Sequence, residues 1–230
     1  LVKIVDVRTT VVSLPRASTL TTSYGSGDLA TTVIVELMTD EGSVGVGQTA
    51  VAPRSYGETA EGISANIQKH LVPAILGEEP FDIERLNQKL QAALPHHWSS
   101  HAGIELALWD LKGKALGVPV YQLLGGKVRD GVDLMGFVHH DKPEQMAEEA
   151  RATLDEHGFD VLKMKIGLEP KEDVKRYQAV AEAVADRAVI QVDGNTGYTI
   201  SQAIPALTEM EGIGALGAIE QPVERLEDLA

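Results

Sequence analysis

Four apolar, strand-like segments recur at a constant spacing in the second half of the chain. They start at positions 132, 160, 188 and 216, and they read VDLMGFV (132–138), DVLKMKIG (160–167), AVIQVDGN (188–195) and LGAIEQP (216–222). Helical patterns fill the equal intervals, which predicts parallel strands joined by crossover helices. Such a repeat fits a (β/α)8 barrel or a doubly wound sheet. A barrel is favoured, because FVHHDKP follows the first strand where a dinucleotide-binding sheet would carry a glycine-rich turn.

The first part of the chain has a different pattern. Residues 2–14 alternate and are β-branched, which predicts a strand, and residues 31–50 predict two strands joined by a turn at TDEG. The segment 15–30 is rich in Ser, Thr and Gly and is predicted to be a flexible loop. Helical patterns follow at 57–71, 81–93 and 100–116.

These patterns predict an α/β protein with two domains. Residues 1–115 are predicted to form an α+β domain with a three-stranded sheet and helices. Residues 116–230 are predicted to form the first half of a (β/α)8 TIM-type barrel, with about the first four of its strands.

Composition excludes several kinds of partner and site. The formal net charge of −14 argues against nucleic acid or an anionic membrane as a partner. The sequence contains no cysteine, so a metal ion must be held by oxygen or nitrogen ligands. No apolar run reaches membrane-spanning length, and a cytoplasmic location is expected. The chain begins at Leu1 rather than Met, from which we expect a trimmed or incompletely represented N-terminus.

Polar residues stand at the ends of the predicted parallel strands. Lys163 and Lys165 lie two apart and therefore point to the same side of an extended strand. Asp193 and Asn195 end the next strand, and Glu220 ends the one after it. Because the carboxyl ends of barrel strands converge on one mouth, where active sites are found, we expect these side chains to meet.

The residue types in this set suit chemistry at a metal ion. The carboxylates of Asp193 and Glu220 are hard oxygen ligands of the kind Mg²⁺ prefers, although either acid alone would be read as a helix cap or an ion-pair partner. Two buried ammonium groups side by side disfavour the charged form of one of them. Lowering a lysine pKa from about 10.4 to about 7 takes about 4.6 kcal/mol, and the product is an amine that can act as a general base.

Longer motifs resemble a known family. The stretch IELALWDLKGKALGVPVYQLLGG (104–126) resembles the helix and loop that join the capping domain to the barrel in the enolase superfamily, specifically in its mandelate racemase and muconate lactonizing branches. The motifs KMK, VDGN and IEQP follow in the order of that family. The resemblance extends over essentially the whole chain, with residues 1–115 similar to the capping domain.

The resemblance implies Mg²⁺-dependent removal of the proton α to a substrate carboxylate, through an ene-diolate. Lys165 would be the base, and Lys163 would lower the pKa of Lys165 and touch the substrate carboxylate. Asp193 and Glu220 would be the first two Mg²⁺ ligands. Asn195 would contact the substrate, as would Tyr24 in the segment 15–30, which would close over it. The partner implied is a small-molecule carboxylate, and a homo-oligomer is expected.

Within that family the sequence favours the muconate-lactonizing subgroup. The expected enzyme is an isomerase, a racemase/epimerase or cycloisomerase acting on N-acyl amino acids, dipeptides or muconates. Asn195 favours this reading, since several acid-sugar dehydratases carry His at that place. The alternatives are a dehydratase of the mandelate racemase subgroup and a non-catalytic protein with half a site. Whether His139 or His140, after the first barrel strand, touches the substrate stays open.

Four strands cannot close an eight-stranded barrel, and half a barrel would expose two sheet edges. The resemblance places the third carboxylate ligand and a second acid/base on later strands. We therefore expect that the natural chain continues past Ala230 or that another chain completes the barrel, and that the polypeptide 1–230 alone binds Mg²⁺ weakly and is inactive.

Overall fold

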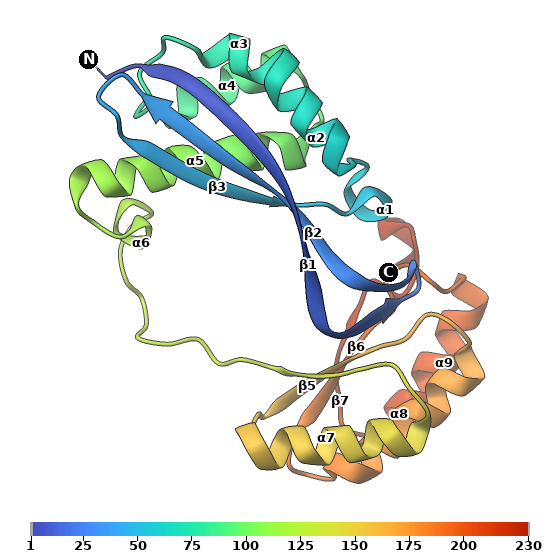
Figure 1. Ribbon diagram of the computed structural model, residues 1–230. Coiled ribbons are helices and arrows are strands. Elements are labelled where there is room, and N and C mark those ends of the chain that lie inside the picture. The colour runs from blue at the N-terminus through green and yellow to red at the C-terminus, as the bar shows by residue number, and fades with distance from the viewer. Residues whose placement is uncertain (1, 230) are drawn as a thin grey trace. The chain divides into compact units, whose positions relative to one another are not determined.

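The computed structural model describes residues 2–229 (Figure 1). The chain divides into two compact units. The first consists of Leu1–Pro15 and Leu29–Asp130, and the second of Arg16–Asp28 and Gly131–Ala230.

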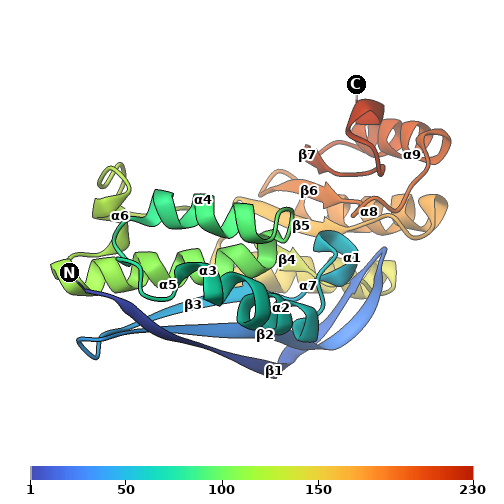
Figure 2. The same cartoon turned by 90° about the horizontal axis from the view of Figure 1, so that it is seen from above.

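The first unit is built on a three-stranded sheet with the strand order β1 (Ile4–Thr22), β2 (Gly25–Thr39) and β3 (Val44–Ala50). β2 and β3 are antiparallel and are joined by the predicted turn, with Met38 opposite Val44. Alternate residues are buried on one face, and the helices of this unit cover that face (Figure 2). The predicted α+β architecture with three strands is confirmed.

Helical segments follow the sheet in the order α1 (Pro53–Tyr56), α2 (Ala60–Asn66), a π-helical turn η1 (Ile67–Leu71), α3 (Val72–Ile75), α4 (Ile83–Ala93), α5 (Trp98–Leu116) and α6 (Val120–Leu123). The long helix α5 packs directly on β3. A Cβ atom at Gly47 would collide with the carbonyl oxygen of Gly103, so the two backbones touch. Between residues 2 and 229, no helix combines the length and apolar character needed to cross a bilayer.

The prediction of a flexible loop at 15–30 is wrong, because the segment continues β1 and β2 as a long hairpin. The hydroxyl groups on which the loop prediction rested form hydrogen bonds between the two strands. Thr19 Oγ1 donates to Asp28 Oδ1 (2.5 Å), and Thr21 and Ser26 share a hydrogen bond of 2.9 Å. β-branched threonine also favours extended backbone. We call residues 16–28, which belong to the second unit, the arm.

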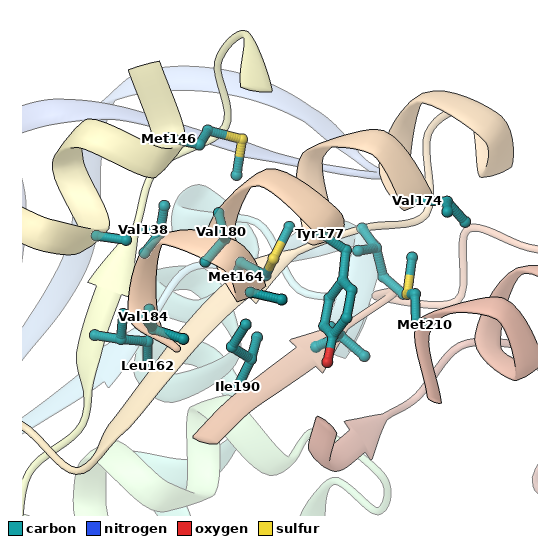
Figure 3. Close-up of a cluster of buried hydrophobic side chains, with 14 of the residues drawn as sticks. Val138, Met146, Leu162, Met164, Val174, Tyr177, Val180, Val184, Ile190 and Met210 are labelled. Atoms are coloured by element: carbon teal, nitrogen blue, oxygen red, sulfur yellow. The ribbon is translucent and has the colours of Figure 1, made fainter. Parts of the chain in front are cut away.

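The second unit contains a parallel sheet with the order β4 (Gly136–Val138), β5 (Val161–Lys165), β6 (Val189–Asp193) and β7 (Leu216–Glu220). The crossover helices are α7 (Pro143–His157), α8 (Pro170–Val184) and α9 (Ile200–Ile213), and a 3-10 turn, η2, spans Leu226–Leu229. Side chains from the strands and these helices form one core around Tyr177 (Figure 3). The predicted parallel βα architecture is confirmed, although the first strand is only three residues long.

In the first unit, a buried carboxylate caps the start of α5. Oε1 of Glu58 accepts hydrogen bonds from the backbone N–H groups of Ser99 (2.8 Å) and Ser100 (3.3 Å), and the Ser100 hydroxyl donates to Oε2. These N–H groups belong to the first turn of α5, and the N–H groups of a first turn have no hydrogen-bond acceptors within their own helix. The carboxylate therefore satisfies donors that would otherwise be buried without acceptors.

We expect Glu58→Ala to lower the free energy of unfolding of the first unit by about 1–3 kcal/mol, because it leaves buried N–H groups unpaired. Urea denaturation followed by tryptophan fluorescence measures this, since Trp98 and Trp109 both lie on α5. Glu61→Ala, which removes an exposed acid from the first turn of α2, is the matched control and should cost at most about 1 kcal/mol. Equal effects of the two substitutions would contradict the capping role.

Candidate active site

β5 separates its lysines from its apolar residues by simple alternation. Leu162 and Met164 are fully buried in the core against the helices. Lys163 and Lys165 point to the opposite face of the sheet, where their side chains are 19% and 13% exposed. The strand can therefore hold two lysines without placing an ammonium group in the apolar core.

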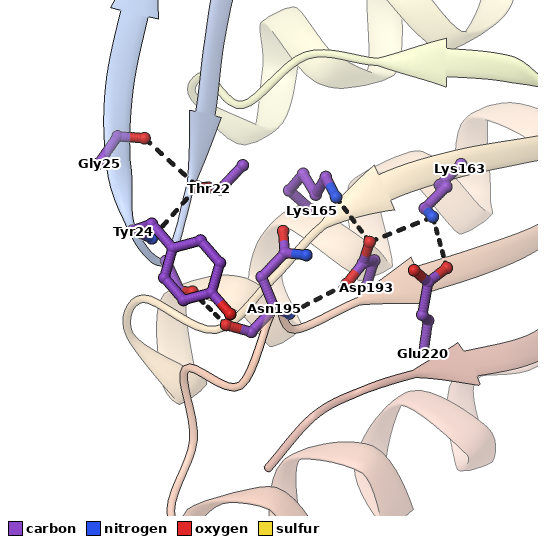
Figure 4. Close-up of polar contacts among 9 residues, drawn as sticks. Thr22, Tyr24, Gly25, Lys163, Lys165, Asp193, Asn195 and Glu220 are labelled. Atoms are coloured by element: carbon purple, nitrogen blue, oxygen red, sulfur yellow. Dashed lines mark hydrogen bonds and ion pairs between the residues drawn. The ribbon is translucent and has the colours of Figure 1, made fainter. Parts of the chain in front are cut away.

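The register of the sheet aligns the polar strand ends. Lys165 lies opposite Asp193 on β6, and Asp193 lies opposite Glu220 on β7. Nζ of Lys165 lies 2.6 Å from Oδ2 of Asp193. Nζ of Lys163 lies 3.1 Å from the same oxygen and 2.5 Å from Oε2 of Glu220 (Figure 4). The structure thus brings these four predicted site residues into one continuous chain of ion pairs.

Two members of this set of ion pairs, Lys163 and Asp193, have pKa values shifted in favour of their charged forms. Burial lowers the pKa of Lys163, but its hydrogen bonds to Glu220 and Asp193 outweigh burial, so this pKa lies above the ordinary lysine value. Burial raises the pKa of Asp193, but hydrogen bonds from Lys165, from a backbone N–H and from Lys163 outweigh it, so that pKa is lowered. Lys163 is therefore an ammonium and Asp193 a carboxylate at neutral pH.

The turn after β6 carries Asn195 in an unusual conformation. Asn195 and Thr196 both have left-handed backbone angles (φ 42° and 62°), which non-glycine residues adopt at some energetic cost. The Asn195 N–H donates to Oδ1 of Asp193 (2.9 Å), so the turn helps to orient that carboxylate. The side-chain oxygen of Asn195 is buried and has no hydrogen-bond partner among the described residues.

The tip of the arm lies on this turn. The Ser23 hydroxyl donates to the carbonyl oxygen of Asn195 (2.5 Å), and the Tyr24 hydroxyl lies 3.1 Å from Oγ1 of Thr196. Tyr24 therefore lies next to Asn195, as Figure 4 shows. Because a Cβ on Gly197 would collide with the Gly167 carbonyl oxygen, the turn also touches the loop after β5.

The buried carboxylate of Asp173 forms hydrogen bonds to the loop after β5 and to the segment that follows Asn195. Oδ2 of Asp173, on α8, accepts hydrogen bonds from the backbone N–H groups of Gly167 (2.9 Å) and Leu168 (3.1 Å) and from the Tyr198 hydroxyl (2.7 Å). Its Oδ1 accepts from Arg176 (3.0 Å). Gly167 follows Lys165 by two residues and Tyr198 follows Asn195 by three, so Asp173 fixes the loop that follows Lys165 and the turn that carries Asn195.

Sequence reasoning missed several residues of this region. Gln191 lies opposite Lys163 and two positions before Asp193, so strand alternation could have identified it as a residue of the same face. Ser23 and Thr196 contribute to contacts between the arm and the turn after β6, which are remote from each other in the sequence, and no local pattern signals such contacts. Asp173 stood inside a predicted helix with nothing to distinguish it.

The donor set fits Mg²⁺. Two carboxylates lie on adjacent strands with a cationic group between them. Asn195, two residues after Asp193, adds a buried side-chain oxygen that has no hydrogen-bond partner in the part of the chain that the structure describes. Oxygen donors of this kind suit Mg²⁺, which binds through one or two carboxylates and keeps water or substrate. The described residues contain no group of three or more His, Asp or Glu that could hold a metal. The residues therefore fit two ligands of a magnesium site.

Comparison with known protein families gives a match in each half of the chain. Residues 4–125 match the family model of the mandelate racemase / muconate lactonizing enzyme N-terminal domain, and residues 145–230 match the enolase C-terminal domain-like model. The chain belongs to the mandelate racemase/muconate lactonizing enzyme family. The predicted membership in this branch of the enolase superfamily is thereby confirmed.

Individual members of the mandelate racemase/muconate lactonizing enzyme family are similar along most of this chain. N-succinyl-L-Arg/Lys racemase of Bacillus cereus is 35% identical over 96% of this chain and 60% of its own length. Muconate cycloisomerase 1 of Pseudomonas putida is 35% identical over 85% of this chain and 53% of its own. The structure of a dipeptide epimerase from Enterococcus faecalis, complexed with Mg and the dipeptide L-Leu-L-Tyr, matches with a TM-score of 0.90 at 31% identity, over 99% of this chain and 64% of that one. The chain thus spans less than two thirds of the length of each of these relatives.

Proposed function

We propose that this chain forms part of a Mg²⁺-dependent isomerase that removes the proton α to a substrate carboxylate. The observation that carries the proposal is the chain of ion pairs from Lys165 through Asp193 and Lys163 to Glu220. It gathers a lysine pair and two carboxylates, which would bind the metal, at the carboxyl ends of three successive parallel strands, where barrel active sites lie.

The residues divide into three roles. Asp193 and Glu220 would hold Mg²⁺, and the bound ion would stabilise negative charge that develops on the substrate carboxylate. Lys163 stays protonated, because carboxylates raise its pKa, and it would hold the substrate carboxylate as a cation. Lys165 is the proposed base, which would accept the α-proton at Nζ. Asp193 orients Lys165, because its carboxylate receives the hydrogen bond of that amine at 2.6 Å.

The relatives support a particular substrate class. The names of the Bacillus racemase and the Enterococcus epimerase describe an N-acylated amino acid and a dipeptide, both of which carry an amide beside the α-carbon. We propose substrates of this class, with Asn195 and Tyr24 contacting the acylated end. Cycloisomerisation of a muconate is the second candidate, favoured by the equally high identity to muconate cycloisomerase 1.

Solvent deuterium exchange tests the proposal directly. The natural protein that carries this chain, incubated with N-acyl amino acids and dipeptides in D₂O and Mg²⁺, should replace the α-proton with deuterium, as ¹H NMR shows by loss of the α-proton signal. Removal of divalent ions with EDTA should abolish exchange, and added Mg²⁺ should restore it, because without the ion the ene-diolate charge lacks a counter-charge.

Two results would count against this function. Exchange that continues at full rate in EDTA would exclude the metal-assisted reaction. If none of the acylated amino acids exchanges while a muconate is converted to a lactone, the second candidate takes the place of the first.

A further inference from the structure

A second hydrogen-bonded constellation lies in the same unit and is not used by the proposed reaction. Oγ of Ser18, on the arm, lies 2.6 Å from Nε2 of His139, which follows β4. Nδ1 of His139 lies 2.5 Å from Oε1 of Glu149 on α7. The three side chains come from three separate segments of the chain and form one line of hydrogen bonds from hydroxyl to imidazole to carboxylate.

The carboxylate of Glu149 fixes both the position and the tautomer of the His139 imidazole. Oε2 of Glu149 also accepts the backbone N–H of His139 (2.8 Å), so both of its oxygens hold the same residue. A carboxylate accepts hydrogen bonds and therefore requires the proton on Nδ1. Nε2 is then a lone-pair acceptor directed at the Ser18 hydroxyl, which is the arrangement that activates a serine nucleophile.

The constellation is open to small molecules. A cavity of about 320 Å³ adjoins it, and the residues that line it include Ser18 and His139, the apolar residues Leu20 and Phe137, and the cationic residue Arg16. That volume is at the lower end for ligand pockets, which suits a short acyl group. The Phe137 ring lies edge-on to the imidazole, with ring centroids 5.1 Å apart, and supports its orientation.

We propose that Ser18, His139 and Glu149 form a second reactive site, in which Ser18 is a nucleophile toward small esters or thioesters with an anionic end. Ser18 Oγ bonds to the carbonyl carbon while its proton passes to Nε2 of His139. That proton goes to the departing alkoxide or thiolate as the acyl bond breaks. Water then adds to the acyl-serine by the same route, releasing the acid and restoring the hydroxyl. Ester and water give acid and alcohol, and no other reactant is needed.

The positive charge in the cavity sets the expected preference. The chain as a whole is acidic, with a formal net charge of −14, yet Arg16 is among the residues that line this cavity. A guanidinium attracts an anionic group and stabilises the oxyanion that forms during acyl transfer. Hemi-esters of short dicarboxylic acids should therefore react faster than neutral esters of the same length.

A fluorophosphonate probe tests the proposal on the intact protein, because it forms a stable bond to an activated serine oxygen with loss of fluoride. Mass spectrometry of the digested protein should find the label on Ser18. Labelling and hydrolysis of a p-nitrophenyl hemi-ester should both fall about 100-fold or more in Ser18→Ala and in His139→Gln, since a general base contributes about 10²–10⁴-fold. Ser26→Ala is the matched control, because Ser26 lies on the same arm and bonds only to Thr21 among the contacts described; it should change neither rate.

A variant of the proposed isomerase site shows whether the two reactions are independent. Lys165→Met, which removes the proposed base, should leave Ser18 labelling unchanged, so either reaction can fail without the other. Failure to label Ser18, or equal labelling of Ser18 in the wild type and His139→Gln, would show that these bonds only hold the arm in place and would overturn the proposal. Circular dichroism of each variant confirms that the fold is kept.

Discussion

Replacement of Lys165 by methionine should abolish α-proton exchange, with a loss of about 10²–10⁴-fold or more, the contribution of a positioned general base. Methionine keeps the unbranched apolar stem and removes only the amine that lies 2.6 Å from Asp193. The Asp193 carboxylate retains hydrogen bonds from Lys163 (3.1 Å) and from the Asn195 N–H (2.9 Å), so the site should keep its shape. The measurement is ¹H NMR of the substrate α-proton in D₂O.

Lys175→Met is the matched control, because Lys175 is an exposed lysine on α8 whose ammonium pairs with Glu172. It should leave exchange unchanged. Lys163→Met should weaken substrate binding in addition to slowing exchange, since the proposed role of that ammonium is to hold the carboxylate. Persistent exchange in Lys165→Met, with the fold intact by circular dichroism, would remove Lys165 from the role of base.

The sequence predicted the parallel half of the fold because its evidence is local and repeated. The segments at 188–195 and 216–222 contain β6 and β7, and the constant spacing reflects one strand, one helix and two short loops. The strand prediction was too long where apolar residues do not pair with a neighbouring strand. Of the segment 132–138 only Gly136–Val138 pairs with β5, while Val132 and Leu134 are exposed and precede the strand.

The lysines and acids of the site were predictable because their evidence is also local and repeated. The contacts of the arm that hold the site were not predictable. Lys163 and Lys165 share a face by strand alternation, and a parallel sheet with equal repeats brings Asp193 and Glu220 beside them. The arm depends instead on contacts between residues far apart in sequence. Its hydroxyl-rich composition is typical of a loop, and only cross-strand pairing and the contact of Ser23 with the turn after β6 show that it is ordered.

Asp173→Ala should be among the most destabilising single substitutions in the second unit, with a loss of about 3–5 kcal/mol in the free energy of unfolding, because removal of one member of a buried ion pair leaves the other charge uncompensated. Asp173 is fully buried and is the anionic partner of Arg176, whose side chain is 17% exposed. Two backbone N–H groups, on Gly167 and Leu168, also lose their acceptor.

The Tyr198 hydroxyl adds to this cost. Burial and the hydrogen bond to Asp173 raise the pKa of Tyr198, so its phenol remains a protonated donor throughout the ordinary pH range. Without the carboxylate, this donor is left without its acceptor in the core. Glu172→Ala, one residue earlier on the same helix, removes only an exposed pair with Lys175 and should cost less than about 1 kcal/mol.

Urea denaturation with two probes assigns the Asp173 effect to its unit. Trp98 and Trp109 are the two tryptophans of the chain and both lie on α5, so their fluorescence follows the first unit, whereas far-UV circular dichroism follows helices of both units. Asp173→Ala should shift the circular dichroism transition more than the fluorescence transition, and Glu58→Ala should do the reverse. Equal shifts for Asp173→Ala and Glu172→Ala would show that the buried network contributes little. A large shift means that the carboxylate that holds the second unit together also holds the loop after Lys165 and the turn that carries Asn195. The geometry of the site then depends on a residue whose hydrogen bonds go to the backbone of Gly167 and Leu168 and to Tyr198.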